Sequence, residues 1–372
     1  MCAHVNTNKY NYLFFHIFDT TKFFHYNLKH TSITTIKEIA KRAGVSEGTI
    51  DRVIHNRGQV SKTNVEKVNK IIKKLGYKPN VFARNLALNK THTFAVLLPK
   101  KEDLDYWKTT VEGIKRAEKE LSVFGLKINY YFHNYSVKSF NLQAAKIIKD
   151  KPLAILFAPL ATEPSIAFIA KCKKASVAYA LIDSNISHQT PVTYVGQDAF
   201  RSGHLAGKLC GYNKGKKILV VKIAPELENN AVLKQRTEGF YSYYKENKLT
   251  MNIEELNFNN PESVRLGKHL SIENQNSIHA VFVPNSRAHI VAQHLKKHNL
   301  KTRLIGYDLI SKNIEFLKTD FIDFLINQKP EQQGYIGINA LYRKLILKDN
   351  VNEINYMPIE IIVKENVEYS QG

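Results

Sequence analysis

The stretch TSITTIKEIAKRAGVSEGTIDRVIHNRGQVSKTNVEKVNKIIKKLGYKPNVFARNLALNK, residues 31–90, determines how the rest of the chain is interpreted. Apolar side chains recur on one face of a first short helix over residues 36–40. Gly44 then provides a turn with a backbone conformation that other residues resist, and Ser46 is well placed as the N-cap of a second helix, 47–54. Two short helices joined by a tight turn predict a helix-turn-helix, whose second helix can enter the major groove of DNA.

The charge of this stretch agrees with a nucleic-acid partner. Thirteen Lys or Arg less four acidic residues give residues 31–90 a net charge of +9. A positive surface of this density suits the phosphate backbone of DNA. At most about half of the net charge of +21 lies in this stretch. A solvated basic hairpin without a partner is the alternative, but turn, cap and charge coincide in one segment.

A third helix and a short Pro-bounded segment follow. Ser61 can cap the third helix, and Gly76 stands where a helix commonly ends. Pro79 blocks continuation and Asn80 offers another cap, so residues 81–88 form a separate segment. An isolated helix of this length is marginal in water, so we expect it to be ordered only against a partner.

The stretch TIKEIAKRAGVSEGTIDRVIHNRGQVSKTNVEKVNKIIKKLGYKPNVFARNLA resembles the N-terminal module of the lactose/purine repressor (LacI) family. The rest of the chain matches more loosely, so the resemblance covers all but about the first thirty residues. It implies that residues 81–88 are a hinge helix that folds on DNA, with Leu86 of each subunit wedged into the minor groove. A linker leucine packed on the next domain is the alternative. With this resemblance, the residues assigned to DNA contact are Thr35, Ser46, Glu47, Gly48, Thr49, Arg52, Asn56, Asn80, Ala83 and Leu86.

The second helix departs from the family pattern in its polar residues. The family often has Ser where this chain has Asp51. The phosphates of DNA would repel the Asp51 carboxylate, which could instead pair with a basic residue within the protein, for example Lys41. Gly48 cannot read a base with a side chain and weakens a helix by up to ~1 kcal/mol relative to Ala. Glu47 can accept a hydrogen bond from cytosine N4. The operator sequence of the family therefore does not transfer to this chain.

From residue 93 onward, short apolar strands alternate with amphipathic helices. We expect strands at 93–99, 127–133, 153–159, 177–183, 192–198, 217–223, 252–258, 280–285, 303–308 and 324–328. We expect helices near 107–123, 138–150, 162–175, 199–212, 231–248, 261–272, 286–298, 311–319 and 331–347. This alternation predicts two parallel, doubly wound sheets, and the resemblance implies a two-lobed, periplasmic-binding-protein-like α/β domain with a ligand cleft.

The predicted fold is therefore a small all-α helix-turn-helix domain followed by a two-lobed α/β domain. We expect a disordered extension over 1–32, the helix-turn-helix over 33–78, a hinge over 79–91 and the effector-binding and dimerisation domain over 92–368. Lobe 1 is expected over about 92–212 and 329–354, and lobe 2 over about 213–328 and 355–368. The apolar runs of residues 1–30 are too short for a signal sequence or a membrane span, and a mis-assigned start codon is a plain explanation for this segment.

Polar residues gather at the carboxyl ends of the predicted strands, where open α/β sheets bind ligands. Carboxylates, amides and a guanidinium offer donors and acceptors to a polyhydroxylated molecule, and an aromatic ring offers a face to a sugar. The residues assigned to the effector are Trp107, Asp183, Asp198, Arg236, Phe258, Asn285, Asp308 and Gln328. The alternatives remain a loop cap for any single strand-end Asp and a core position for each of the two aromatic residues.

Other chemistries find no support in the sequence. No G-x-G-x-x-G follows the first strand and no phosphate-binding P-loop motif occurs, so no nucleotide cofactor is expected. Cys2, Cys172 and Cys210 form no C-x-x-C pair. His294 and His298 have helical metal-binding spacing but no evident third ligand. We therefore expect no catalytic site, no cofactor and no metal.

The sequence predicts a cytoplasmic, homodimeric transcription regulator, acting as a repressor. Its expected partners are double-stranded DNA with a palindromic operator and a small carbohydrate or polyol, with no membrane partner. A solute-binding protein of a transport or sensing system is the alternative, and it needs no helix-turn-helix. An enzyme on an α/β scaffold, or a regulator whose cleft is vestigial, are further alternatives.

Overall fold

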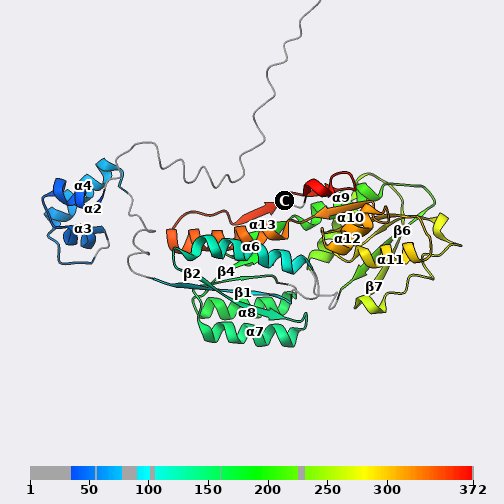
Figure 1. Ribbon diagram of the computed structural model, residues 1–372, viewed down its shortest axis with the longest axis horizontal. Coiled ribbons are helices and arrows are strands. Elements are labelled where there is room, and N and C mark those ends of the chain that lie inside the picture. Colours follow the sequence, from blue (N-terminus) through cyan, green and yellow to red (C-terminus); the bar gives the residue numbers. More distant parts are fainter. Residues whose placement is uncertain are drawn as a thin grey trace, which may run out of the picture. The chain divides into compact units, whose positions relative to one another are not determined.

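The computed structural model describes residues 35–54, 57–77, 90–100, 105–159, 161–224 and 231–370. Its contacts divide the chain into two compact units, Met1–Asn80 and Val81–Gly372. Figure 1 shows the helical elements of the first unit and the two sheet-based lobes of the second. None of the helices in this described part combines the length and hydrophobicity that spanning a bilayer requires.

The described part of the first unit is all-α, with helices α2 (Ile36–Ala43), α3 (Glu47–Ile54) and α4 (Lys62–Leu75). One apolar face of each helix contributes to a single small core. Its buried residues are Ile39, Ala40, Ala43, Ile50, Val53 and Val68. The predicted helix-turn-helix is confirmed, with α2 and α3 as its two helices.

Local hydrogen bonds set the ends of these helices. Each helix begins at a residue whose hydroxyl accepts a bond from a backbone N–H three residues later: Thr35, Ser46 and Ser61, at 3.2, 3.2 and 3.4 Å. Gly44 and Gly76 end α2 and α4 with φ of +63° and +58°, a conformation that a side chain would strain. The turn between α2 and α3 is therefore set by Gly44, which ends the first helix, and by Ser46, which begins the second.

In the described part of the second unit, the strands form two six-stranded sheets. The first sheet has the order β11-β5-β4-β3-β1-β2 and is parallel throughout its described pairs. Its strands are β1 (His92–Pro99), β2 (Leu126–His133), β3 (Ala154–Phe157), β4 (Ala178–Ile182), β5 (Tyr194–Gln197) and β11 (Ile354–Met357). We call this sheet and its helices the first lobe.

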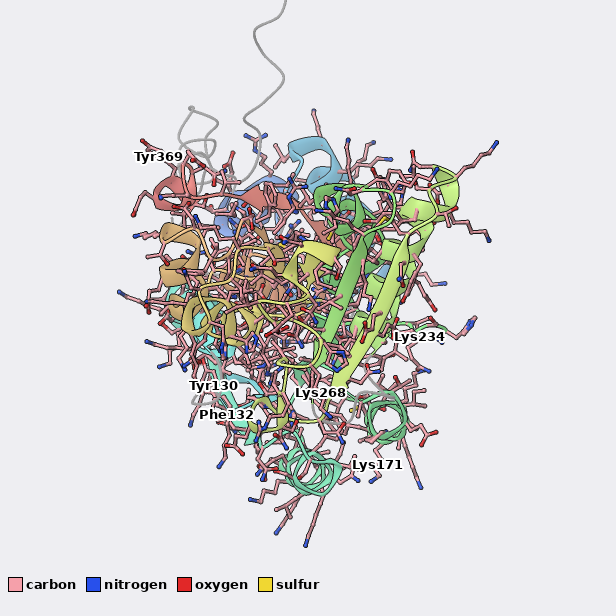
Figure 2. The ribbon with its side chains drawn as sticks, turned by 90° about the vertical axis from the view of Figure 1, so that its right-hand side faces the viewer. Tyr130, Phe132, Lys171, Lys234, Lys268 and Tyr369 are labelled. Carbon is pink, nitrogen blue, oxygen red and sulfur yellow. The ribbon has the colours of Figure 1, made fainter. Side chains whose placement is uncertain are left out.

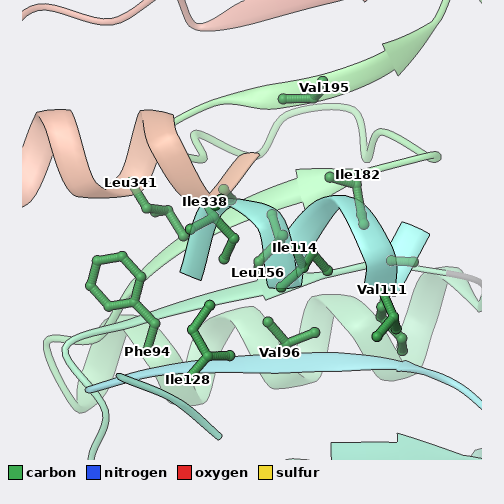
Figure 3. Close-up of a cluster of buried hydrophobic side chains, with 14 of the residues drawn as sticks. Phe94, Val96, Val111, Ile114, Ile128, Leu156, Ile182, Val195, Ile338 and Leu341 are labelled. Carbon is green, nitrogen blue, oxygen red and sulfur yellow. The ribbon is translucent and has the colours of Figure 1, made fainter. Parts of the chain in front are cut away.

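Helices cover both faces of the first sheet, as Figure 1 shows. On one face lie α6 (Asp105–Ser122) and α13 (Pro330–Tyr342), and on the other α7 (Val137–Asp150) and α8 (Thr162–Lys174). The core between the sheet and the α6–α13 pair is drawn in Figure 3, where Ile114 and Ile338 come from these helices and Val96 and Leu156 from the strands. Near-continuous burial along β1, β3 and β4 follows from this covering of both faces.

The second sheet has the order β12-β10-β9-β8-β6-β7. It comprises β6 (Lys217–Ile223), β7 (Asn252–Phe258), β8 (Ile278–Phe282), β9 (Arg303–Tyr307), β10 (Phe324–Asn327) and β12 (Glu360–Ile362). Its pairs are parallel except that β12 runs antiparallel to β10. Helices α9 (Ala199–Cys210) and α10 (Ala231–Glu246) cover one face, and α11 (Ala288–Lys297) and α12 (Ser311–Lys318) the other. This is the second lobe.

The structure corrects the expected lobe boundaries. Helix α9 was expected in lobe 1, but Ala206 and Cys210 are buried in the core of the second sheet, so the first crossing follows β5 and not residue 212. Strand β11 extends the first sheet to Met357, and the chain crosses back before Glu360. The sequence analysis predicted neither β11 nor β12, because these short, half-exposed strands lack the continuous apolar run of the central strands.

One predicted helix is wrong. Over residues 261–272 only a 3₁₀ turn, Pro261–Ser263, forms, although Leu266 and Leu270 are buried in the second-lobe core. Their spacing of four residues is that of a helix, but an irregular segment here buries the same two side chains. The prediction failed because hydrophobic spacing reports which residues are buried and does not by itself determine the backbone.

Gln197 joins the points at which the chain passes between the lobes. Its side chain is 3% exposed, and Nε2 donates to the carbonyl oxygens of Asn327 and Pro358 at 3.0 and 3.1 Å. Gln197 is the last residue of β5, Asn327 is the last residue of β10, and Pro358 lies between β11 and β12. These hydrogen bonds therefore tie together the segments in which the chain crosses between the lobes.

Candidate functional site

Helix α3 presents a polar surface in the first unit. Its Ile50 and Val53 are buried, whereas Glu47, Gly48 and Arg52 are exposed. An eight-residue helix held from one side by a small core leaves these three positions open to a partner. The geometry is that of a helix that could lie in a DNA groove.

The hydroxyl-bearing candidates serve the helix ends in this structure. Thr35 caps α2, and Ser46 accepts from the backbone N–H of Thr49 while its hydroxyl lies 2.9 Å from the Thr49 hydroxyl. Asp51 accepts a hydrogen bond from Arg57 Nη1 at 3.0 Å, an ion pair within the protein. The other DNA-contact candidates, Asn56, Asn80, Ala83 and Leu86, lie outside the described residues.

A cleft opens between the two lobes of the second unit. Nine residues of each lobe line it. From the first lobe they are Tyr106, Trp107, His133, Tyr135, Ser136, Val137, Phe140, Ala161 and Asp183. From the second lobe they are Ala224, Val232, Leu233, Arg236, Asn285, Ser286, Arg287, Asp308 and Gln328. The first-lobe wall is rich in aromatic rings, and the second-lobe wall contributes both arginines and two amides.

A buried arginine organises the second-lobe wall. Arg236, on α10, is 3% exposed and donates from Nη1 to the Pro284 carbonyl oxygen at 2.8 Å and from Nη2 to Gln328 Oε1 at 2.5 Å. Its guanidinium lies 3.8 Å from the centre of the Tyr307 ring, a distance typical of a cation–π contact. Among the atoms of the described residues, Arg236 Nε has no hydrogen-bond partner. The two hydrogen bonds use two of the five N–H donors of the guanidinium, so the Nε–H is among the donors left over for a molecule in the cleft.

Gln328 connects this arginine to a carboxylate. Its Nε2 donates to both oxygens of Asp308, at 2.9 and 3.0 Å, while its Oε1 accepts from Arg236. Asp308 follows β9 with φ of +70°, a left-handed conformation that Asp tolerates better than most residues. Arg236, Gln328 and Asp308 therefore form one continuous, oriented polar chain along the cleft wall.

A second polar group belongs to the first lobe. Tyr106 donates its hydroxyl to Asp183 Oδ1 at 2.6 Å, and Asp183 follows β4 with φ of +66°. Gln333, at 1% exposure in the first turns of α13, accepts from the Asp183 backbone N–H at 2.9 Å. Its Nε2 donates to the Gln328 carbonyl oxygen at 2.9 Å. One amide thus connects the strand end of each lobe.

Burial determines the charge state of the two carboxylates. Desolvation raises the pKa of Asp308 to about 7, although Arg236 and Gln328 oppose this rise. Desolvation also raises the pKa of Asp183, against the lowering effects of Tyr106, Arg236 and Ser184. Each carboxylate oxygen already accepts one hydrogen bond within the protein, and its remaining acceptor capacity suits a ligand rich in hydroxyl groups.

Metal chemistry has no built site in the described residues. No group of three or more His, Cys, Asp or Glu side chains there is arranged to hold a metal ion. His294 and His298 lie with ring centres 4.6 Å apart, and His294 Nε2 is hydrogen-bonded to the Leu270 carbonyl at 2.9 Å. Helical spacing alone explains this pair of histidines.

Comparison with known proteins accounts for both units. The model of bacterial regulatory proteins of the lacI family matches residues 35–80, and a periplasmic binding protein domain matches residues 94–349. A solved structure from Bacteroides fragilis, described as a LacI transcriptional regulator, is 30% identical with a TM-score of 0.70. It aligns over 75% of this chain and 99% of its own. This chain belongs to the LacI family.

Two curated relatives extend the similarity of this LacI-family protein. The NTD biosynthesis operon regulator NtdR of Bacillus subtilis is 29% identical over 173 residues, 46% of this chain and 50% of its own length. The sucrose operon repressor of Staphylococcus xylosus is 27% identical over 232 residues, 62% of this chain and 68% of its own. The match to NtdR therefore spans about half the length of that protein.

Six of the eight residues assigned to the effector of this LacI-family protein line the cleft: Trp107, Asp183, Arg236, Asn285, Asp308 and Gln328. The other two have structural contacts elsewhere. Asp198 caps α9, accepting from the Arg201 backbone N–H at 2.9 Å, and Phe258 packs against the second-lobe core. For these two, the alternatives of a helix cap and a core position describe the observed contacts.

Sequence reasoning missed other residues that line or brace the cleft. Tyr106 precedes an assigned residue, Trp107, and itself binds Asp183, but nothing local distinguishes a buried Tyr at the start of a helix. Gln333 lies in α13, five residues after Gln328, but 150 residues from Asp183, the other strand end that it joins. His133 could have been found, because it ends β2 as the assigned residues end their strands.

Proposed function

We propose that this LacI-family chain is a transcriptional repressor that acts in the cytoplasm as a homodimer on a palindromic operator. The supporting observation is that one chain combines an exposed, capped α3 with a two-lobed cleft lined by aromatic rings and by buried polar side chains. Its effector is a small carbohydrate or polyol that binds between the lobes and changes the affinity for DNA. The repressor names of its relatives support the same proposal.

DNA contact is assigned to both the helix-turn-helix and the segment after it. Glu47 and Arg52 on α3 are the side chains best exposed for base or phosphate contact. Asn80, Ala83 and Leu86 remain assigned to DNA contact, with Leu86 as the minor-groove wedge that the family resemblance implies. A solute-binding protein without a DNA role would share the cleft but has no use for this N-terminal unit.

Binding to DNA is tested by fluorescence anisotropy on a palindromic operator as the salt concentration rises from 50 to 200 mM. Because phosphate contacts release counterions, six or more contacts predict a fall in affinity of roughly 10³-fold or more. A chain that begins at residue 91 lacks the helix-turn-helix and should not bind. Unchanged binding across the salt range, or full binding by the shortened chain, contradicts the DNA role.

The effector role is tested by comparing two substitutions on the same helix. Arg236→Ala removes the buried fork between Pro284 and Gln328, which should cost about 2–5 kcal/mol of ligand binding and so abolish the response of DNA binding to sugar. Lys234→Ala is the matched control, because Lys234 projects from α10 at 77% side-chain exposure and does not line the cleft (Figure 2). The probes are sucrose, D-glucose, D-galactose and D-ribose, and an equal response of both variants would refute the cleft assignment.

A further inference from the structure

His133 occupies a distinct place in the cleft wall. It is the last residue of β2. Two other residues of this strand, Tyr130 and Phe132, which Figure 2 labels, pack against the core that α6 and α13 share with the first sheet. Side chains alternate along a strand, so His133 lies on the opposite face of the sheet, where its ring contacts Phe140 of α7. At that end of the sheet it lines the cleft.

The surroundings of His133 are aromatic and leave its nitrogens without partners. The side chain is 2% exposed, and its ring centre lies 5.5 Å from that of Phe140 and 6.3 Å from that of Tyr135. Neither ring nitrogen has a hydrogen-bond partner among the described residues. A buried polar group without a partner costs about 1–3 kcal/mol, so its presence in a ligand cleft calls for a function.

The protonation state of the ring determines what it can bind. Desolvation lowers the pKa of His133 to about 4, so the imidazole is neutral at pH 7 and offers one N–H donor and one acceptor nitrogen. A hydroxyl group can accept from the donor or donate to the acceptor. A carboxylate or phosphate could accept a hydrogen bond from the ring N–H but could not donate to the other nitrogen. A protonated ring would attract such an anion, but burial makes the charged form of His133 unfavourable.

The opposite wall shows the same pattern. Arg236 Nε, in the second lobe, is also without a hydrogen-bond partner in the described part of the chain. The cleft thus offers an unused donor on one wall and a neutral donor–acceptor ring on the other. A molecule with hydroxyl groups at both ends would satisfy both walls when it binds.

We propose that His133 is a specificity-determining residue that contacts a hydroxyl group of an uncharged ligand at the first-lobe end of the cleft. The proposal rests on the effector role of the cleft. It adds a residue that the strand-end assignment did not include, and it selects uncharged polyols or sugars over acidic ones. His92 provides a comparison within the same lobe, since it is 9% exposed with an unpartnered Nε2 but does not line the cleft.

The test measures ligand binding by calorimetry with the full chain and three variants. His133→Phe keeps an aromatic ring against Phe140 while removing both nitrogens, and His133→Gln keeps one donor and one acceptor. His92→Phe is the matched control for removal of a buried imidazole. The probes are sucrose, D-glucose, D-galactose and D-ribose, together with the acidic sugars D-glucuronate and D-glucose 6-phosphate.

We expect His133→Phe to weaken binding of the preferred neutral sugar by about 10- to 100-fold, His133→Gln to restore part of it, and His92→Phe to leave it unchanged. Thermal unfolding of each variant without sugar shows that the lobes remain folded. Derivatives of the preferred sugar that each lack one hydroxyl group identify the hydroxyl that His133 contacts. The derivative without that hydroxyl should bind the native chain more weakly than the sugar does, and His133→Phe should not weaken its binding further.

Three results would overturn the assignment. They are equal affinity of the native chain and His133→Phe, a preference for the acidic sugars, and no binding of any neutral sugar by the native chain. Operator binding measured in the same samples keeps the DNA role separate. If the native chain binds operator and a sugar, the first or the second result refutes only the role of His133, whereas no binding of any neutral sugar also contradicts the effector role of the cleft. If the chain binds sugar through His133 but does not bind operator, only the proposed repressor function is refuted.

Discussion

The helix-turn-helix and the cleft are built in opposite ways. In the first unit the polar bonds are exposed and local, such as those from Thr35 to Glu38 and from Asp51 to Arg57. In the cleft they are buried and join distant parts of the chain, such as Tyr106 to Asp183 and Asp183 to Gln333. A partner as large as DNA needs an open surface, whereas a small ligand needs a site that replaces its water.

The difference also concerns stability. Among the described residues, the first unit has one small cluster of buried side chains, while each lobe of the second has two larger ones. A change in the small core should therefore disable DNA binding without affecting the cleft. Substitutions in the two regions can test this separation, beginning with the largest expected effect.

Ile50→Ala should unfold the first unit at growth temperature. Ile50 is fully buried in the core that holds α3, and removing such a side chain costs roughly 2–5 kcal/mol. Calorimetry should show the low-temperature transition lost and the transition of the lobes unchanged, with operator binding abolished. A single transition shifted as a whole would show that the two units unfold together, which contradicts the proposed separation.

Asp308→Asn should stabilise the lobes at alkaline pH while weakening the sugar response. The folded-state pKa of Asp308 is raised to about 7, above its ordinary value of 3.8, so the folded chain holds this proton more tightly than the unfolded chain does. Stability from this group is therefore present at low pH and falls as pH rises from about 4 through 7. An amide cannot ionise, so the variant should lose this slope.

The expected gain at pH 8 is on the order of a few kcal/mol, because one pKa unit corresponds to about 1.4 kcal/mol and the raised value already includes the attraction to Arg236. Denaturant unfolding of both chains at pH 5 and pH 8 measures it. Asp320→Asn, at an exposed position whose carboxylate pairs with Lys364, is the control and should leave the slope unchanged. Parallel pH profiles for the native chain and Asp308→Asn would show that this carboxyl is not the source.

Asp51→Asn should have the smallest effect on stability. Its ion pair with Arg57 is exposed, with side-chain exposures of 43% and 55%, and such pairs contribute roughly 0–1 kcal/mol. Operator affinity should rise slightly, because one negative charge near the phosphates is removed. Anisotropy at 50 mM salt measures the rise, and a loss of affinity would instead indicate that the Asp51–Arg57 pair orients a DNA contact.

The order of these effects follows from burial. Ile50 and Asp308 lie where no water can replace a lost contact, whereas Asp51 lies where water and salt compete with its partner. If Asp51→Asn proved as damaging as Ile50→Ala, the description of the first unit as a small core carrying an open surface would be wrong.

The sequence by itself determined the local features of this protein. Ser46, Gly44 and the spacing of Ile36 to Ala40 predicted the helix-turn-helix, because caps, turns and helical periodicity depend on neighbours a few residues away. The strand ends also gave Asp183 and Asp308, because parallel strands bring their carboxyl ends to one edge of a sheet.

Only the tertiary structure decided which of these residues share a site. Asp198 and Asp308 both follow a strand, yet the first caps α9 and the second lies in the cleft. Gln333 and His133 enter the site through contacts with residues far along the chain or on a neighbouring helix. Such contacts depend on how helices and strands that are distant in sequence pack against one another. A short stretch of sequence therefore does not predict them.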